Sequence, residues 1–127
     1  MNKKNLVIIT IVVGVVLVAV VALALMPSKP GIYDDFATCL KDSGAKFYGT
    51  FWCPHCLEQK KIFGKSVKFL PYVECSNPQG NAFLPICTDK GIDRVPTWEF
   101  ADGSKKTGVF SIEELAEFTS CPVPNKQ

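Results

Sequence analysis

Two cysteines separated by two residues, in Cys53-Pro54-His55-Cys56, are the side chains in this sequence best placed for chemistry. An aromatic run precedes them and Pro54 can occupy the first turn of a helix, so the motif is expected at a strand-to-helix junction. The N-terminus of a helix carries a partial positive charge, which stabilises a thiolate at Cys53. His55 can add a positive charge or a hydrogen bond. The pattern predicts a redox pair in which Cys53 reacts first and Cys56, more deeply buried, resolves the mixed disulfide.

Three other interpretations of the motif are open: a structural disulfide, half of a zinc site, and a copper site made by Cys53, Cys56 and His55. A tetrahedral zinc site usually takes four nitrogen or sulfur ligands. The sequence has no second C-x-x-C and contains one histidine. A strand-to-helix junction also suits a reactive disulfide better than a cross-link. We therefore expect no metal, and no cofactor other than the disulfide itself.

The remaining sequence predicts the elements that position this motif. The predicted strands are 46–52, 71–75, 97–101 and 104–109. The predicted helices are 33–43, a helix that begins at Pro54, 84–90, and 111–120 with a Ser111/Glu114 capping box. The order α-β-α-β-α-β-β-α predicts an α/β fold with a mixed four-stranded sheet and helices on both faces. The two β-α-β connections predict parallel strands, and Asp102-Gly103 predicts an antiparallel final hairpin.

The chain begins with a long apolar segment. No charged residue lies between Leu6 and Met26, and such a helix spans about 30 Å, the thickness of a bilayer core. Lys3 and Lys4 precede it, so the positive-inside rule leaves the N-terminus in the cytoplasm. The predicted organisation is a cytoplasmic N-terminus (1–5), a transmembrane anchor (6–26), a linker (27–32) and an extracytoplasmic domain (33–127). Cleavage of a signal peptide after Ala22-Leu23-Ala24 is the alternative.

Charge and cysteine content limit the possible partners. The chain has 14 basic and 12 acidic residues, and the excess comes from Lys3 and Lys4. The domain is therefore neutral, which argues against nucleic acid as a partner. Six cysteines in 127 residues are typical of an oxidising compartment or of redox chemistry.

Four cysteines lie outside the motif and allow three pairings. We favour a local Cys75–Cys87 bond together with a long-range Cys39–Cys121 bond, both as structural cross-links. Two alternatives are open. The four can be buried free thiols, or Cys75–Cys87 can be a second redox pair that relays electrons.

The stretch Phe51-Trp52-Cys53-Pro54-His55-Cys56, followed by Val95-Pro96-Thr97, resembles the thioredoxin superfamily over residues 33–127. The resemblance implies that Pro96 is a cis proline lying against the active-site disulfide. It also implies that the backbone of Val95 pairs with the substrate chain and that Trp52 is the aromatic residue beside the motif. The Pro-His dipeptide is the one found in DsbA-type bacterial oxidases.

A wider set of segments resembles the thioredoxin-like domain attached to bacterial vitamin K epoxide reductase homologues. These segments are 44–56, 63–65, 71–75 and 96–99. The resemblance implies that the domain takes electrons from substrate thiols and passes them to a quinone-reducing membrane domain. A single anchor cannot form a four-helix quinone site, so the resemblance implies a separate partner oxidase of the vitamin K epoxide reductase or DsbB type.

The sequence departs from the thioredoxin pattern in two respects. Phe47 stands six residues before Cys53, where thioredoxins have a buried acid that accepts a proton. Glu58 or Glu99 could replace that acid, although both are expected at the solvated surface, and Trp98 is expected to pack in the core. The first thioredoxin strand is also missing, which implies a reduced thioredoxin fold.

These observations predict a membrane-anchored thiol-disulfide oxidoreductase of the cell membrane, with a single span and its catalytic domain on the extracytoplasmic face. Its expected substrates are the thiols of secreted proteins, into which it introduces disulfides. A reductase or disulfide isomerase is the alternative within the same class. A redox-inert module that binds extended peptides beside Val95 and Pro96 is the alternative of another class.

Overall fold

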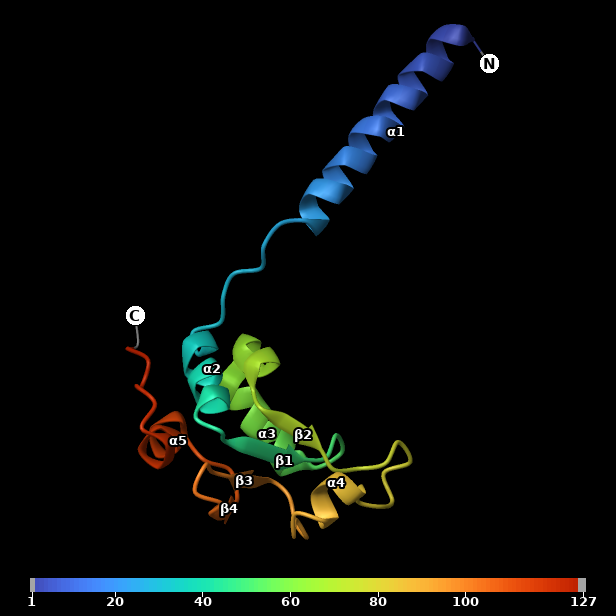
Figure 1. Cartoon of the computed structure of the whole chain (residues 1–127). Helices are drawn as coiled ribbons and strands as arrows, with labels where there is room; N and C mark the ends of the chain where they lie inside the picture. Colours follow the sequence, from blue (N-terminus) through green and yellow to red (C-terminus); the bar gives the residue numbers. More distant parts are fainter. Residues whose placement is uncertain (1, 126–127) are drawn as a thin grey trace.

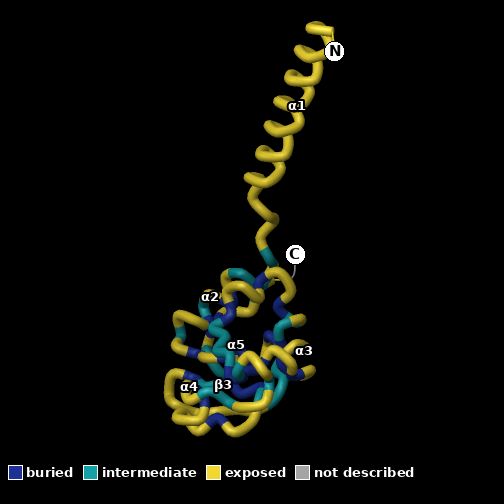
Figure 2. Tube along the Cα trace, turned by 90° about the vertical axis from the view of Figure 1, so that its right-hand side faces the viewer, coloured by how far each residue is buried: buried dark blue, intermediate teal, exposed yellow. Residues whose placement is uncertain are grey.

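The computed structural model describes residues 2–125. Its first element is the helix α1 (Lys3–Ala24), which extends away from the rest of the chain (Figure 1). The helix is long and apolar enough to cross a membrane, and none of its residues is buried (Figure 2). It ends two residues before the predicted anchor does, and Pro27, Pro30 and Gly31 then prevent a helix from continuing.

The other elements follow in the predicted order, α-β-α-β-α-β-β-α, with a 3₁₀ helix added directly after the helix that begins at Pro54. They are α2 (Asp34–Asp42), β1 (Lys46–Gly49), α3 (Pro54–Phe63), η1 (Gly64–Phe69), β2 (Tyr72–Glu74), α4 (Pro85–Thr88), β3 (Thr97–Glu99), β4 (Lys105–Thr107) and α5 (Ile112–Thr119). The first strand is shorter than the predicted 46–52 because the chain turns at Phe51 and Trp52. This turn places Cys53 at the start of α3.

The four strands form one mixed sheet in the order β2-β1-β3-β4. Strand β1 pairs in parallel with β2 and antiparallel with β3, and β3 and β4 form the predicted antiparallel hairpin. In this register Phe47 lies between Tyr72 on one side and Trp98 on the other.

One predicted strand direction is wrong. We expected both β-α-β connections to give parallel strands, but β3 runs antiparallel to β1, and therefore to β2 as well. The cause lies in the connection, which stays at the end of the sheet where β2 finishes. The Leu84 N–H donates to the Cys75 carbonyl at 2.8 Å, Ser76 pairs with Phe83, and the Cys75–Cys87 disulfide closes the same loop. The chain consequently re-enters the sheet from that end.

Helices cover both faces of the sheet, as predicted. On one face Phe47 and Trp98 stack with ring centroids 4.8 Å apart, and side chains of α2, α3 and α5 pack on them. On the other face Tyr48 packs with Ile92 and the Cys75–Cys87 disulfide. Figure 1 shows α4 on the side of the sheet opposite α2 and α3.

A buried glutamine on α3 fixes the position of that helix. The side chain of Gln59 is fully buried, and its Nε2 donates to the Phe110 carbonyl at 2.9 Å. Its Oε1 accepts from the Phe110 N–H at 2.8 Å and from Trp98 Nε1 at 3.4 Å. Because these bonds satisfy a polar group inside the core, they hold α3 at a defined distance from β3 and from the start of α5.

Candidate active site

Cys53 and Cys56 lie at the N-terminus of α3 and are present as thiols. Cys53 is the residue that caps the helix, and Pro54 occupies its first turn, where a missing N–H costs nothing. The Cys53 side chain is 7% exposed and that of Cys56 is fully buried. Cys53 is therefore the thiol nearer to solvent, and it lies where the helix dipole favours a negative charge.

The structure brings Val95 and Pro96 to Cys53, although 42 residues separate Cys53 from Val95. The Val95–Pro96 peptide bond is cis. The carbonyl oxygen of Val95 lies 3.9 Å from Cys53 Sγ, and Pro96 is buried behind it. A backbone carbonyl thus flanks the sulfur that a substrate thiol would approach.

The turn before Cys53 is held by the last residue of β2 and by a residue just after that strand. The Phe51 N–H donates to Glu74 Oε1 at 3.3 Å, and Trp52 Nε1 donates to Ser76 Oγ at 3.0 Å. Both rings lie over Gly80, where the position of an added Cβ is 3.3 Å from Trp52 and 3.6 Å from Phe51. Phe51, Trp52 and Leu57 are about half exposed, so apolar surface flanks Cys53.

His55 points into solvent. Its Nδ1 lies 3.4 Å from Glu58 Oε2, and both side chains are more than 60% exposed. The polar partner of the imidazole in this structure is therefore Glu58 and not a cysteine sulfur. Among residues 2–125, no group of three or more His, Cys, Asp or Glu side chains is placed to hold a metal ion.

Comparisons with known proteins bear on this arrangement. No protein-family model matches the chain. The chain is 45% identical over 84 residues to the thiol-disulfide oxidoreductase LTO1 of Arabidopsis thaliana. The similarity supports a thioredoxin-like oxidoreductase enzyme. The matched region is 63% of this chain but only 22% of the plant protein, so the chain corresponds to less than a quarter of that relative.

The surroundings of Cys56 come from three parts of the chain: α3, β1 and β2. An added Cβ at Gly49 would lie 3.1 Å from Cys56 Sγ and 2.8 Å from the Tyr72 ring, so glycine at this position lets the two side chains approach. Burial, together with the neighbouring Cys53, raises the pKa of the Cys56 thiol to about 12. A backbone hydrogen bond from Thr50 and the charge of Lys60 act in the opposite direction.

Lys60, Tyr72 and Glu74 are functional candidates that the sequence analysis did not identify. Burial lowers the pKa of Lys60, whereas the charge of Glu74 raises it. Burial and a hydrogen bond to Glu74 raise the pKa of Tyr72. One local pattern could have pointed to this group, because Lys60 lies four residues after Cys56 on the same helix and therefore on the same face. The strand residues Tyr72 and Glu74 carried no comparable local signal.

The two carboxylates considered as substitutes for a buried acid lie elsewhere. Glu58 pairs with His55 at the surface. Glu99 accepts a hydrogen bond from the Tyr48 hydroxyl at 2.8 Å, on the sheet face away from Phe47. This contact and burial raise the pKa of Tyr48 to about 12, with burial the larger cause.

The other four cysteines form two disulfides. Cys39–Cys121 joins α2 to the second residue after α5, and Cys75–Cys87 joins the residue after β2 to α4.

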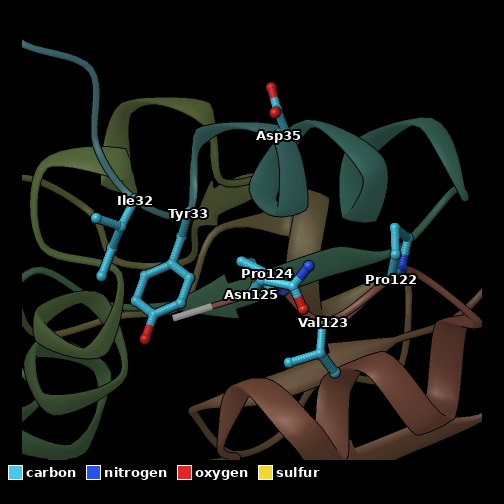
Figure 3. Close-up of a pocket in the computed structure, with 7 residues that line it drawn as sticks. All are labelled: Ile32, Tyr33, Asp35, Pro122, Val123, Pro124 and Asn125. Carbon is cyan, nitrogen blue, oxygen red and sulfur yellow. The ribbon is translucent and has the colours of Figure 1, made fainter. Parts of the chain in front are cut away.

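A cavity of about 700 Å³ lies apart from Cys53 and Cys56, where the linker and the C-terminal segment meet (Figure 3). The residues that line it are Ile32, Tyr33, Asp35, Pro122, Val123, Pro124 and Asn125.

Proposed function

We propose that this chain is a membrane-anchored thiol-disulfide oxidoreductase that introduces disulfides into secreted proteins. The observation that carries the proposal is the arrangement of the motif: Cys53 caps α3 next to the Val95 carbonyl, while Cys56 is fully buried behind it. The 45% identity to a protein named a thiol-disulfide oxidoreductase supports the same chemistry.

In the proposed reaction the enzyme begins with a Cys53–Cys56 disulfide. A substrate thiolate attacks Cys53 Sγ, a substrate–Cys53 disulfide forms, and the electron pair of the broken bond passes to Cys56 Sγ, which takes up a proton. A second substrate thiolate then attacks the substrate sulfur of the mixed disulfide. The substrate leaves oxidised by two electrons, and the enzyme is left with two thiols. Attack at Cys53 is favoured because Cys56 has no exposed surface.

The proposed substrate lies as an extended chain against Val95, with the exposed rings of Phe51 and Trp52 and the Leu57 side chain as its apolar contacts. Unfolded secreted proteins expose both backbone hydrogen-bonding groups and apolar side chains. In this proposal the former pair with the backbone of Val95 and the latter contact the exposed apolar side chains. His55, exposed beside Pro54, is in this proposal a polar contact for the incoming chain.

The proposed setting is the cell membrane. In this proposal α1 spans the bilayer and, with Lys3 and Lys4 on the cytoplasmic side, the domain faces the extracytoplasmic space. The two disulfides of the domain are stable in such an oxidising compartment. The proposed reoxidising partner is a quinone-linked membrane oxidase of the vitamin K epoxide reductase or DsbB type.

The test uses the full chain in detergent micelles, oxidised, mixed with a reduced and unfolded disulfide-containing protein. We expect one disulfide to form per Cys53–Cys56 disulfide consumed, and we expect Cys53→Ser to abolish the reaction. Undiminished oxidation by Cys53→Ser would contradict the proposal. An inactive wild type would instead favour the redox-inert peptide-binding module.

The direction of electron flow is tested by the reduction potential of the Cys53–Cys56 pair in glutathione buffers, with mass spectrometry to follow each cysteine. A reduction potential of about −120 mV supports a thiol oxidase, whereas one of about −270 mV supports a reductase.

A further inference from the structure

A lysine, a tyrosine and a glutamate lie together directly behind the active-site cysteines. Lys60 is four residues after Cys56 on α3, and its Nζ lies 3.4 Å from the centroid of the Tyr72 ring. The ring and Cys56 Sγ lie 2.8 Å and 3.1 Å from the same point, the position of an added Cβ at Gly49. Cys56, Tyr72 and Lys60 therefore share one space beside β1.

Glu74 completes this group. Its Oε2 accepts a hydrogen bond from the Tyr72 hydroxyl at 2.7 Å. Its Oε1 accepts from the Ser76 N–H at 2.9 Å and from the Phe51 N–H at 3.3 Å. With three donors the carboxylate is fixed, and it fixes Tyr72 in turn. The tyrosine ring then presents its face to Lys60, a contact that holds an ammonium group in place.

We propose that Lys60 is the cation that stabilises the negative charge developing on Cys56 Sγ when the Cys53–Cys56 disulfide is reduced, and that Tyr72 and Glu74 position it. The proposal rests on the redox function proposed above. It assigns a role to a lysine that the disulfide chemistry of the motif does not itself require.

The electron and proton balance of the step is complete with these groups. As the substrate thiolate bonds to Cys53 Sγ, the bond between the two cysteine sulfurs breaks and its electron pair passes to Cys56. Cys56 has no exposed surface, so bulk water does not reach its sulfur directly. Lys60 is only partly buried, so its positive charge compensates the thiolate while a proton reaches the sulfur from water beside the lysine. The thiolate takes up that proton because burial raises the pKa of Cys56.

The charged and titratable groups around Cys56 come from α3 with its cap and from β2. Cys53 and Lys60 act on Cys56, Tyr72 is coupled to it, and Glu74 is bonded to Tyr72. Of these four, Lys60 is the one whose charged form is positive. In a low-dielectric surrounding a single positive charge near the leaving sulfur has a larger effect than it would in water, and a thiol with a lower pKa leaves faster.

The test measures reduction of the oxidised full chain, in detergent micelles, by dithiothreitol. Stopped-flow tryptophan fluorescence follows the reaction from pH 6 to pH 10. The variants are Lys60→Met, Lys60→Gln and Lys60→Arg, with Lys61→Met as the matched control, because Lys61 is the exposed neighbour on the same helix. Circular dichroism and mass spectrometry confirm the fold and the two structural disulfides of each variant.

At pH 7 we expect reduction to slow about tenfold in Lys60→Met and Lys60→Gln, and to stay within about twofold of wild type in Lys60→Arg and Lys61→Met. The advantage of wild type over Lys60→Met should shrink as the pH rises and Lys60 loses its proton.

Two results would overturn the inference: Lys60→Met and Lys60→Gln within about twofold of wild type, or Lys60→Arg as slow as Lys60→Met, which would indicate packing and not charge. Failure of the redox function itself gives a different result, since a redox-inert chain would hold no Cys53–Cys56 disulfide that dithiothreitol reduces.

Discussion

Trp52 Nε1 donates a hydrogen bond to Ser76 Oγ at 3.0 Å, and this bond joins the residue before Cys53 to the residue after Cys75. The neighbouring Phe51 N–H bonds to Glu74 in the same way. The turn that presents Cys53 is therefore supported by the start of the loop that the Cys75–Cys87 disulfide closes. Through these contacts a structural disulfide supports the redox-active pair without taking part in its chemistry.

Substitution of Ser76 by alanine tests this support. The change removes the partner of a half-exposed indole, so we expect a loss of about 1 kcal/mol of stability and faster motion of Trp52. Fluorescence anisotropy decay measures the motion, with the buried Trp98 as a constant background. Ser104→Ala is the control, since Ser104 is exposed and its side chain bonds to Asp102 and not to a tryptophan. An unchanged decay in Ser76→Ala would show that the bond does not restrain the ring.

Gly49→Ala tests the close approach behind the active site. The new Cβ would lie 2.8 Å from the Tyr72 ring and 3.1 Å from Cys56 Sγ, which is too close for either to stay in place. We expect a loss of about 1–3 kcal/mol in the free energy of unfolding, measured by urea titration, and slower reduction by dithiothreitol. Gly14→Ala, whose Cβ would meet nothing within 4 Å, should change neither quantity.

Gln59→Leu tests the buried hydrogen bonds of α3. Leucine has a similar volume but leaves the Phe110 N–H, the Phe110 carbonyl and Trp98 Nε1 without their partner. We expect a loss of about 2–4 kcal/mol in unfolding free energy, since unpaired buried polar groups retain their full desolvation cost. Gln79→Leu, at an exposed position, is the matched control. Equal stability of the two variants would show that these bonds contribute nothing.

The pH dependence of stability tests the buried thiol. Burial raises the pKa of Cys56 from 9.0 to about 12. The thiol is neutral below pH 9 in both the folded and the unfolded protein. Above pH 9 the unfolded chain ionises first, so stability present below pH 9 is lost as the pH rises toward 12. The loss should reach about 1 kcal/mol per pH unit.

The comparison is between Cys53→Ala, which keeps the Cys56 thiol, and the double variant Cys53→Ala/Cys56→Ala. Tyr48 also has a raised pKa, but it is present in both proteins and its effect cancels. The charge of Cys56 contributes to the raised pKa of Tyr72, so the comparison reports Cys56 together with its coupling to Tyr72. Between pH 8 and pH 10.5, the unfolding free energy of the double variant should rise steadily relative to that of Cys53→Ala. Parallel curves would mean that Cys56 titrates normally in the folded state.

The features that the sequence alone determined are those whose physical causes lie within a few residues. Pro54 can begin a helix and cannot continue a strand, so the start of α3 at the cysteine motif was predictable. The Ser111/Glu114 capping box likewise marks the start of α5, and the structure has both of its hydrogen bonds. The helical apolar segment near the N-terminus follows from composition alone.

The tertiary structure decided what depends on residues far apart in the chain. The direction of β3 follows from the tether of residues 75–87 to the end of β2, and no local pattern encodes that tether. The same holds for the group behind Cys56. Lys60 and Tyr72 meet only because β2 pairs in parallel with β1 and Gly49 leaves space beside it. Strand pairing and close packing join distant segments, so they become visible only when the chain is folded.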